Sequence, residues 1–344
     1  MEITTNQKRN NYVDYLRGSA MLIVVFGHTM NGSTVKASDS VLYNIVWSLQ
    51  MPLFILISGY VTRYGRVPDT GRKLLCLLGR RTLMYLLPWF VFTILINGLV
   101  LEKQTLTVDA VFMHMDKSYW FLITIWTISI IFLPARYFAV KVCKKNGLVP
   151  LAVFVFYGIG MALTGCLGML VGLDFLCIKL TLYYMPFFFL GYLFGVYGEQ
   201  FVSRYPRTVS FIVAISTILW VIAILKLRIY YLSDTQAPQI VLRAGISLCG
   251  CIAVCGLMKA VKEASLIYRG VSWVGRHSIE VYLLHYYFLN LIILNSTPDF
   301  LSARGIALVA ANYVITVTIA VAVAKLLGSN RYLNLLLFGR IAKN

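Results

Sequence analysis

The sequence predicts an all-α, polytopic membrane protein with about ten transmembrane helices, and three observations lead to this fold class. Hydrophobic residues make up 59% of the 344 residues and charged residues only 13%, about half the charged share that is usual in soluble domains. Apolar runs of roughly 20 residues recur from end to end, each long enough to cross about 30 Å of hydrocarbon. Basic residues gather in alternate connecting segments, as expected of cytoplasmic loops.

The predicted spans use up almost all of the chain, so residues 1–344 are expected to form a single integral-membrane domain without a separate soluble domain. No cleavable signal peptide is expected, because the first apolar run lacks a small-residue cleavage site and more spans follow it. In chain order, the predicted spans are 12–30, 41–62, 82–101, 119–138, 148–172, 178–197, 208–230, 239–259, 277–296 and 305–327.

The distribution of charge predicts the orientation of these spans. With a cytoplasmic N-terminus, 23 of the 31 Lys and Arg residues fall in inner segments, which favours ten spans with both termini in the cytoplasm. A net charge of +18 would suggest a nucleic-acid partner in a soluble protein. Here membrane topology explains the charge, so the expected partner is the lipid bilayer and no nucleic acid. The seven cysteines have no metal-ligand spacing, and neither a metal site nor a disulfide framework is predicted.

The first span, YVDYLRGSAMLIVVFGHTM (12–30), carries three ionisable residues. A helix turns about 100° and rises about 1.5 Å per residue. Arg17 and His28 therefore differ by only about 20° in direction and about 16 Å in depth, and Asp14 lies within about 40° of His28. This common face is expected to point into the protein or into a water-filled cavity, because lipid does not accept it.

Two interpretations of this face remain open. Asp14 and Arg17 lie near the predicted inner interface, where an ordinary ion pair or snorkelling would explain them. His28 lies near the outer end of an apolar segment, and an ionisable residue there suggests a functional role. Imidazole is the side chain best suited to exchange a proton near neutral pH.

Together with other motifs, this helix resembles the first helix of the membrane acyltransferase-3 family. Arg17 lies within the DYLRG pattern (14–18), and ten residues separate it from His28. Further segments resemble the family in order along nearly the whole chain: MPLFILISGY (51–60), GRRTLMYLLPWF (79–90), SYWFLITIW (118–126), MPFFFLGYLFG (185–195) and VGRHSIEVYLLH (274–285).

The resemblance implies a multi-pass enzyme of the bacterial cytoplasmic membrane. It would transfer an acetyl or other short acyl group from acyl-CoA to a hydroxyl of a surface or lipid-linked saccharide. Acyl-CoA would be a substrate, and no permanently bound cofactor is expected. His28 would act as the general base or as a transient acyl carrier, Arg17 would lie where the acyl-CoA head arrives, and Asp14 would hold Arg17.

Three residues in the middle of the chain are further candidates. Arg80 and Arg81 end a basic loop predicted at 63–81 and fit the phosphates of coenzyme A, although topology alone would also explain them. Trp120 is a candidate for stacking on the acceptor sugar, or it belongs to an interfacial aromatic belt.

The predicted ninth span adds a second histidine. Tyr282 and His285 are three residues apart and share a helix face. His285 is expected about 13 Å beyond Arg276, near the middle of the membrane. It would orient His28, bind substrate, or only hydrogen-bond a neighbouring helix. Glu280 is expected to pair with Arg276 at the interface.

Two other classes of protein remain as alternatives. Buried ionisable groups in ten spans also suit a secondary transporter of a lipid-linked glycan or a small anion, although paired interrupted spans are missing from the sequence. An acyltransferase of the unrelated membrane-bound O-acyl type would depend on a histidine late in the chain, so His285 would then matter more than His28.

Overall fold

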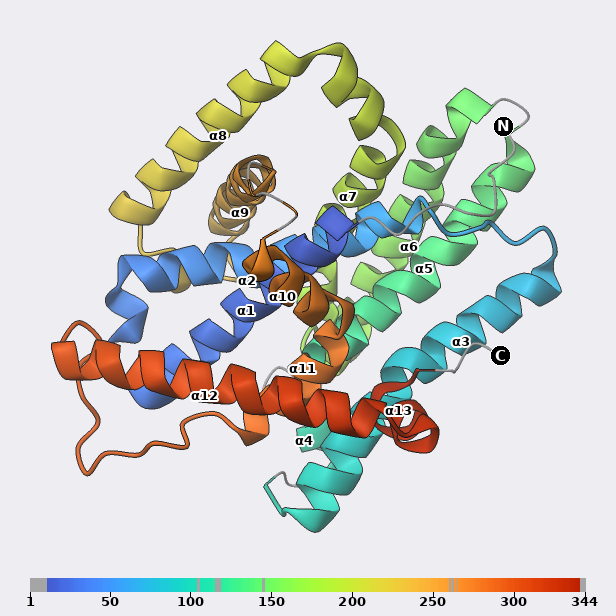
Figure 1. Cartoon of the computed structure of the whole chain (residues 1–344). Coiled ribbons are helices and arrows are strands. Elements are labelled where there is room, and N and C mark those ends of the chain that lie inside the picture. Colours follow the sequence, from blue (N-terminus) through green and yellow to red (C-terminus); the bar gives the residue numbers. More distant parts are fainter. Residues whose placement is uncertain are drawn as a thin grey trace. The chain divides into compact units, whose positions relative to one another are not determined.

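A computed structural model describes residues 11–103, 106–114, 119–143, 146–259, 261, 263 and 265–340. These residues are overwhelmingly helical (Figure 1), and a single isolated bridge, between Val35 and Asp299, is the only β pairing among them. The helices are α1 (Asn11–Ser33), α2 (Val41–Thr62), α3 (Gly71–Phe90), α4 (Val108–Phe112), α5 (Trp120–Val142), α6 (Val149–Val171), α7 (Ile178–Arg204), α8 (Pro206–Lys226), α9 (Ala237–Met258), α10 (Leu266–Arg276), α11 (Ser278–Leu284), α12 (Ala303–Gly328) and α13 (Arg331–Phe338).

The predicted fold class, an all-α membrane protein, is confirmed. Within the described part of the chain, eight helices are long and apolar enough to cross a membrane. They coincide with every predicted span except the first and the ninth. Helix α1 has the length of a span but is not among the eight. The count of ten and the cytoplasmic termini stay predictions, and residues 1–10 and 341–344 lie outside the described part.

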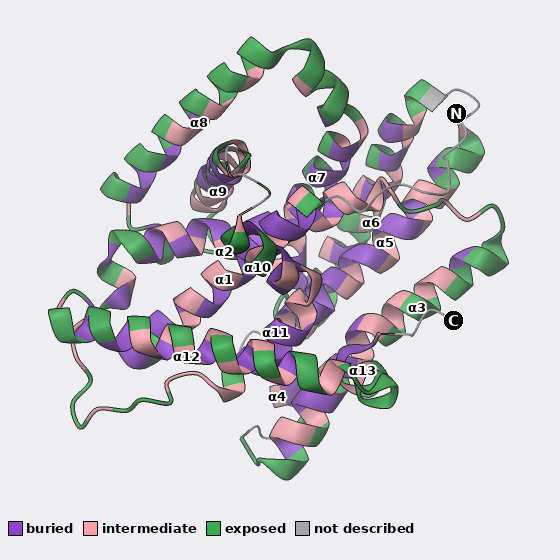
Figure 2. Ribbon diagram, in the orientation of Figure 1, coloured by how far each residue is buried: buried purple, intermediate pink, exposed green. Residues whose placement is uncertain are grey.

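Many residues exposed on these helices are apolar, as a lipid-facing surface requires. On α8, for example, Leu219 and Ile222 are each 53% exposed, whereas Trp220 between them is buried. Figure 2 shows the same alternation of exposed and buried positions along α8 and α12.

The contacts divide the chain into two compact units. The first unit contains residues 1–57 and 201–324, and the second contains residues 58–200 and 325–344. The single domain predicted for the chain stays a prediction.

In the first unit, α1 packs closely along α10 (Figure 1). Two glycines make this approach achievable. A Cβ atom on Gly18 would lie 1.9 Å from the carbonyl oxygen of Val271, and one on Gly275 would lie 1.8 Å from the carbonyl oxygen of Asp14. Small residues at such crossings let two helix backbones come together.

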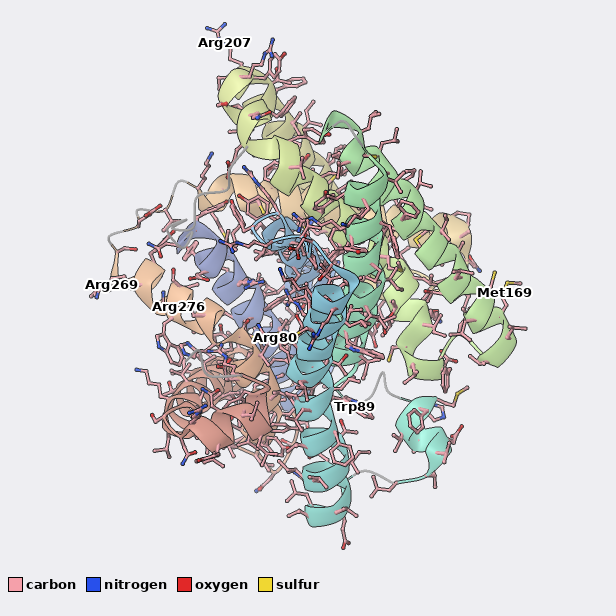
Figure 3. All side chains as sticks on the ribbon, turned by 90° about the vertical axis from the view of Figure 1, so that its right-hand side faces the viewer. Arg80, Trp89, Met169, Arg207, Arg269 and Arg276 are labelled. Carbon is pink, nitrogen blue, oxygen red and sulfur yellow. The ribbon has the colours of Figure 1, made fainter. Side chains whose placement is uncertain are left out.

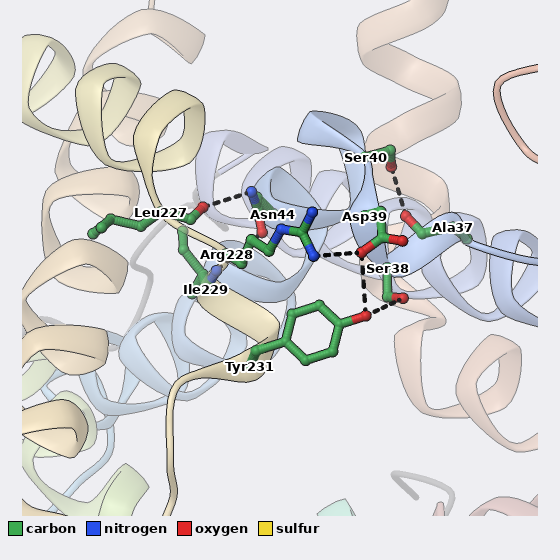
Figure 4. A network of polar contacts seen from close by, with 9 residues as sticks. All are labelled: Ala37, Ser38, Asp39, Ser40, Asn44, Leu227, Arg228, Ile229 and Tyr231. Atoms are coloured by element: carbon green, nitrogen blue, oxygen red, sulfur yellow. Dashed lines mark hydrogen bonds and ion pairs between the residues drawn. The ribbon is translucent and has the colours of Figure 1, made fainter.

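The loops of the first unit that are predicted to lie outside the membrane are joined to one another. Figure 4 shows Arg228 paired with Asp39 at 3.3 Å, and the Tyr231 hydroxyl donating to the same carboxylate. The loop after α1 also contacts the segment before α12. Lys36 pairs with Asp299 at 3.1 Å, and the backbone of Val35 bonds to residues 298 and 300. Segments predicted to share one side of the membrane thus meet in the structure.

The predicted ninth span, 277–296, is not one continuous helix, and that part of the prediction is wrong. The chain instead forms α10, a break at His277, the short helix α11, a 3₁₀ turn over His285–Tyr287 and then non-helical backbone up to α12. At the break, His277 leaves the helical conformation (φ −115°, ψ 29°), and its ring nitrogen Nδ1 bonds to the carbonyl oxygen of Trp273 at 3.0 Å.

Side chains of α1 and α12 hold the non-helical segment in place. Asn312 accepts from the backbone N–H of Ile292 at 2.9 Å and donates to its carbonyl oxygen at 3.0 Å. Thr316 donates to the carbonyl oxygen of Phe288 at 2.8 Å, and Ser33 donates to the Asn290 side chain at 2.6 Å. Non-helical backbone at membrane depth needs such internal partners, so we call Asn312, Thr316 and Ser33 the polar clasp.

The second unit is built mainly on α3, α5, α6 and α7, and α13 packs on α3. Helix α3 continues into a π-helical segment, Val91–Val100. The guanidinium of Arg136 donates to the carbonyl oxygens of Thr62 and Gly65, at 2.6 and 3.0 Å. Arg136 therefore caps the C-terminal end of α2, where a cation also suits the helix dipole.

The glycine contact yields a matched pair of variants on α10. We expect Gly275→Ala to lower the free energy of unfolding by about 1–3 kcal/mol, because the added methyl group meets the backbone of α1. Gly270→Ala is the control, since no atom lies within 4 Å of its Cβ position. Thermal unfolding in detergent measures both, and equal midpoints for the two variants would contradict the close approach.

Candidate functional site

The candidate site begins with His28, which is half-buried near the C-terminal end of α1. The hydroxyl of Tyr286 lies 3.1 Å from its Nε2 and 3.3 Å from its Nδ1. A neutral imidazole offers one N–H and one lone pair, and a hydroxyl can accept from the first or donate to the second. Tyr286 can therefore pair with either tautomer of His28.

The second histidine, His285, is fully buried in the 3₁₀ turn that follows α11. Its Nδ1 lies 2.6 Å from the carbonyl oxygen of Tyr282. Because a carbonyl oxygen only accepts, Nδ1 carries the proton, and Nε2 of the neutral ring has a free lone pair. This Nε2 atom is buried and has no hydrogen-bond partner among the residues that the structure describes.

These three rings form one cluster, which we call the histidine cluster: His28, His285 and Tyr286. The ring centroids of His28 and His285 are 5.2 Å apart, and that of Tyr286 lies 4.7 Å from His28 and 4.4 Å from His285. Tyr286 is 41% exposed, whereas His285 is completely covered. The cluster thus offers proton-accepting nitrogens beside a partly exposed tyrosine, which suits acid–base chemistry.

Asp14, the first residue of the polar face predicted for α1, is buried. It is only 3% exposed, and its backbone meets Gly275 of α10. Arg17 is half-buried one turn further along, and His28 lies beside the turn after α11. The pairing of Asp14 with Arg17 stays a prediction.

Of the other candidates in the ninth segment, Tyr282 is buried on α11, and its ring centroid lies 5.8 Å from that of His285. Tyr282 also supplies the carbonyl oxygen that fixes the His285 tautomer. Glu280 is 1% exposed and Arg276 is half-buried. A buried carboxylate differs from the interfacial position expected of Glu280, because the break at His277 changes which part of the segment faces the core.

Arg80 and Arg81 belong to the second unit and lie within a helix, not in a loop. Helix α3 begins at Gly71, where the Thr70 side chain accepts from the backbone N–H of Lys73 and caps the helix. The predicted loop 63–81 is therefore too long. Arg80 is exposed on this helix (Figure 3), while Arg81 is half-buried and contacts the sulfur of Met84 at 3.8 Å.

Trp120 also belongs to the second unit, at the start of α5. Its ring stacks on Tyr184 with the centroids 5.7 Å apart, and it packs on Ile123 and Cys177. One face of the indole is thus covered by another ring. A role in stacking on a sugar stays a prediction for the other face.

Sequence reasoning missed Tyr286 and the polar clasp. Tyr286 directly follows His285, but helical periodicity cannot place it because the segment leaves the α-helix at that point. Asn312 and Thr316 lie within an apolar span, and its hydropathy does not distinguish them. Their spacing of four residues on α12 was the one available signal, since it puts both side chains on one helix face. No group of three or more potential metal ligands occurs among the described residues.

A comparison with known families identifies the chain. The model of an acyltransferase domain, the acyltransferase-3 family, matches residues 10–325. Neither the curated proteins nor the solved structures contain a match. The matched region covers the histidine cluster and all the predicted spans except the last two residues of the tenth. This chain therefore belongs to the acyltransferase-3 family and is a multi-pass membrane acyltransferase.

Proposed function

We propose that the protein transfers an acetyl or short acyl group from acyl-CoA to a hydroxyl of a cell-surface or lipid-linked saccharide in the bacterial cytoplasmic membrane. The family match supports acyl transfer in general. The observation that carries the proposal is the histidine cluster, in which His28 lies beside a second imidazole and a tyrosine hydroxyl. His28 acts as the general base for the acceptor hydroxyl or carries the acyl group itself.

The polar residues of α1 fit an acyl-CoA donor that arrives from the cytoplasm. In this proposal Arg17, three turns before His28, receives the head of the donor, and the buried Asp14 neutralises or orients Arg17. Arg80 and Arg81 contribute to binding the phosphates of coenzyme A, and Trp120 and Tyr282 contribute to binding the acceptor. Acyl-CoA is a substrate here, so no resident cofactor is needed.

A secondary transporter remains the alternative, and one observation favours it. The broken segment between α10 and α12 resembles the interrupted helices that line transporter binding sites. Uptake of a radiolabelled sugar or small anion by vesicles, with no acyl transfer, would favour transport over the proposed enzyme.

The first of three predictions on acyl-transfer activity concerns His28. We expect His28→Ala to lower acyl transfer by a factor of about 10²–10⁴, which is the usual contribution of general acid–base catalysis. The measurement is transfer from labelled acetyl-CoA in membranes matched for protein amount. His114→Ala is the control, because His114 is an exposed residue whose side chain pairs with Asp109. Retention of more than about a tenth of the activity would exclude this role for His28.

The second prediction concerns the donor. We expect Arg80→Ala and Arg81→Ala to raise the apparent KM for acyl-CoA roughly tenfold, because each removes a charge-assisted contact to phosphate. The KM for the acceptor should change much less. Arg207→Ala, at an exposed position on α8 (Figure 3), controls for loss of a positive charge. An unchanged KM for acyl-CoA in both variants would mean that these arginines do not bind the donor and only determine membrane topology.

The third prediction separates a site role of Arg17 from membrane anchoring. Lysine serves the positive-inside rule as well as arginine, but it lacks the planar fork that holds a carboxylate and a phosphate together. We therefore expect Arg17→Lys and Asp14→Asn to lose most of the transfer activity. Arg269→Lys, at an exposed position on α10, is the control. If both α1 variants keep near-wild-type activity, Asp14 and Arg17 only anchor the helix.

A further inference from the structure

The lone pair on Nε2 of His285 is the unexplained feature of the histidine cluster. His285 is fully buried, and this acceptor has no partner among the described residues. Leaving a buried acceptor unpaired costs about 1–3 kcal/mol, so such atoms usually meet a donor from water or from a bound molecule. The bond from Nδ1 to the Tyr282 carbonyl keeps the lone pair on Nε2.

This arrangement is that of an oriented base. In hydrolases with a catalytic histidine, a partner on Nδ1 fixes the tautomer, and Nε2 then takes the proton from a hydroxyl. His285 has such a partner in the Tyr282 carbonyl. His28 differs, because the Tyr286 hydroxyl lies within reach of both of its ring nitrogens. Among the described residues, no comparable bond fixes one tautomer of His28.

We propose that the two histidines divide the reaction: His285 is the base that deprotonates the acceptor hydroxyl, and His28 is the nucleophile that carries the acyl group. This assignment rests on the proposed function and chooses between the two roles left open for His28. The ring centroids are 5.2 Å apart. An acceptor oxygen about 2.6–3.2 Å from Nε2 would therefore lie close to an acyl group held on the neighbouring ring.

The steps balance without any further reactant. In the first step, a ring nitrogen of His28 bonds to the thioester carbon, the C–S bond breaks, and coenzyme A leaves as the thiolate. In the second step, the acceptor oxygen bonds to the acyl carbon, the bond to His28 breaks, and the hydroxyl proton moves to Nε2 of His285. His285 then passes this proton to the thiolate, which leaves both histidines as they began.

The test compares two acceptors that differ in their need for a base. Purified membranes receive labelled acetyl-CoA and either the glycolipid extract of the same cells or hydroxylamine. Hydroxylamine attacks acyl groups without prior deprotonation, whereas a sugar hydroxyl needs a base. We expect His285→Gln to lose transfer to glycolipid by about 10²–10⁴ and to keep transfer to hydroxylamine. His28→Ala should lose enzymatic transfer to both acceptors.

A second variant controls for loss of activity that is caused by disruption of the fold. The amide of His285→Asn offers a donor that can replace Nδ1 beside the Tyr282 carbonyl, but it provides no basic nitrogen. Undiminished transfer to glycolipid in either His285 variant would overturn the proposal. Loss of both transfers in both variants would also overturn it, because a base is not needed for hydroxylamine. Wild-type protein that acylates neither acceptor would instead disprove the proposed function itself.

Discussion

The close approach of α1 to α10 is the contact on which the candidate site depends. Gly18 and Gly275 allow the two backbones to meet where any side chain would separate them. This crossing fixes the direction of α1 relative to the segment that follows α10. His28, near the other end of α1, is thereby brought beside His285 and Tyr286, which lie some 250 residues later in the chain.

The polar clasp completes this arrangement from the other side. A helix that stops within a membrane protein exposes backbone groups that lipid cannot satisfy. Asn312, Thr316 and Ser33 satisfy several of these groups. As a result the chain can leave the helical conformation after the 3₁₀ turn His285–Tyr287, and the rings of the adjacent residues His285 and Tyr286 both lie beside His28.

Much of the fold could be predicted because hydrophobic length is a local property of the sequence. Eight predicted spans appear as helices, six of them within about four residues of the expected bounds, and the face shared by Asp14 and His28 follows from helical periodicity alone. The break at His277 and the early start of α3 at Gly71 could not be predicted in this way. Both depend on side-chain bonds to the backbone, by His277 and by Thr70, which hydropathy does not record. The partnership of His28 with Tyr286 depends on tertiary contact and has no signature within either segment.

The discontinuous first unit has a consequence for biosynthesis. Helix α1 emerges from the ribosome early, but α10, against which its buried Asp14 packs, begins more than 200 residues later. At about 5–20 residues per second, the interval is roughly 10–50 s. During this interval the second unit is being inserted while Asp14, Arg17 and His28 lack their later neighbours. Helix α1, which is not among the eight long apolar helices of the described part, therefore waits a long time for α10. Its retention at the membrane depends on the insertion machinery until the chain is nearly complete.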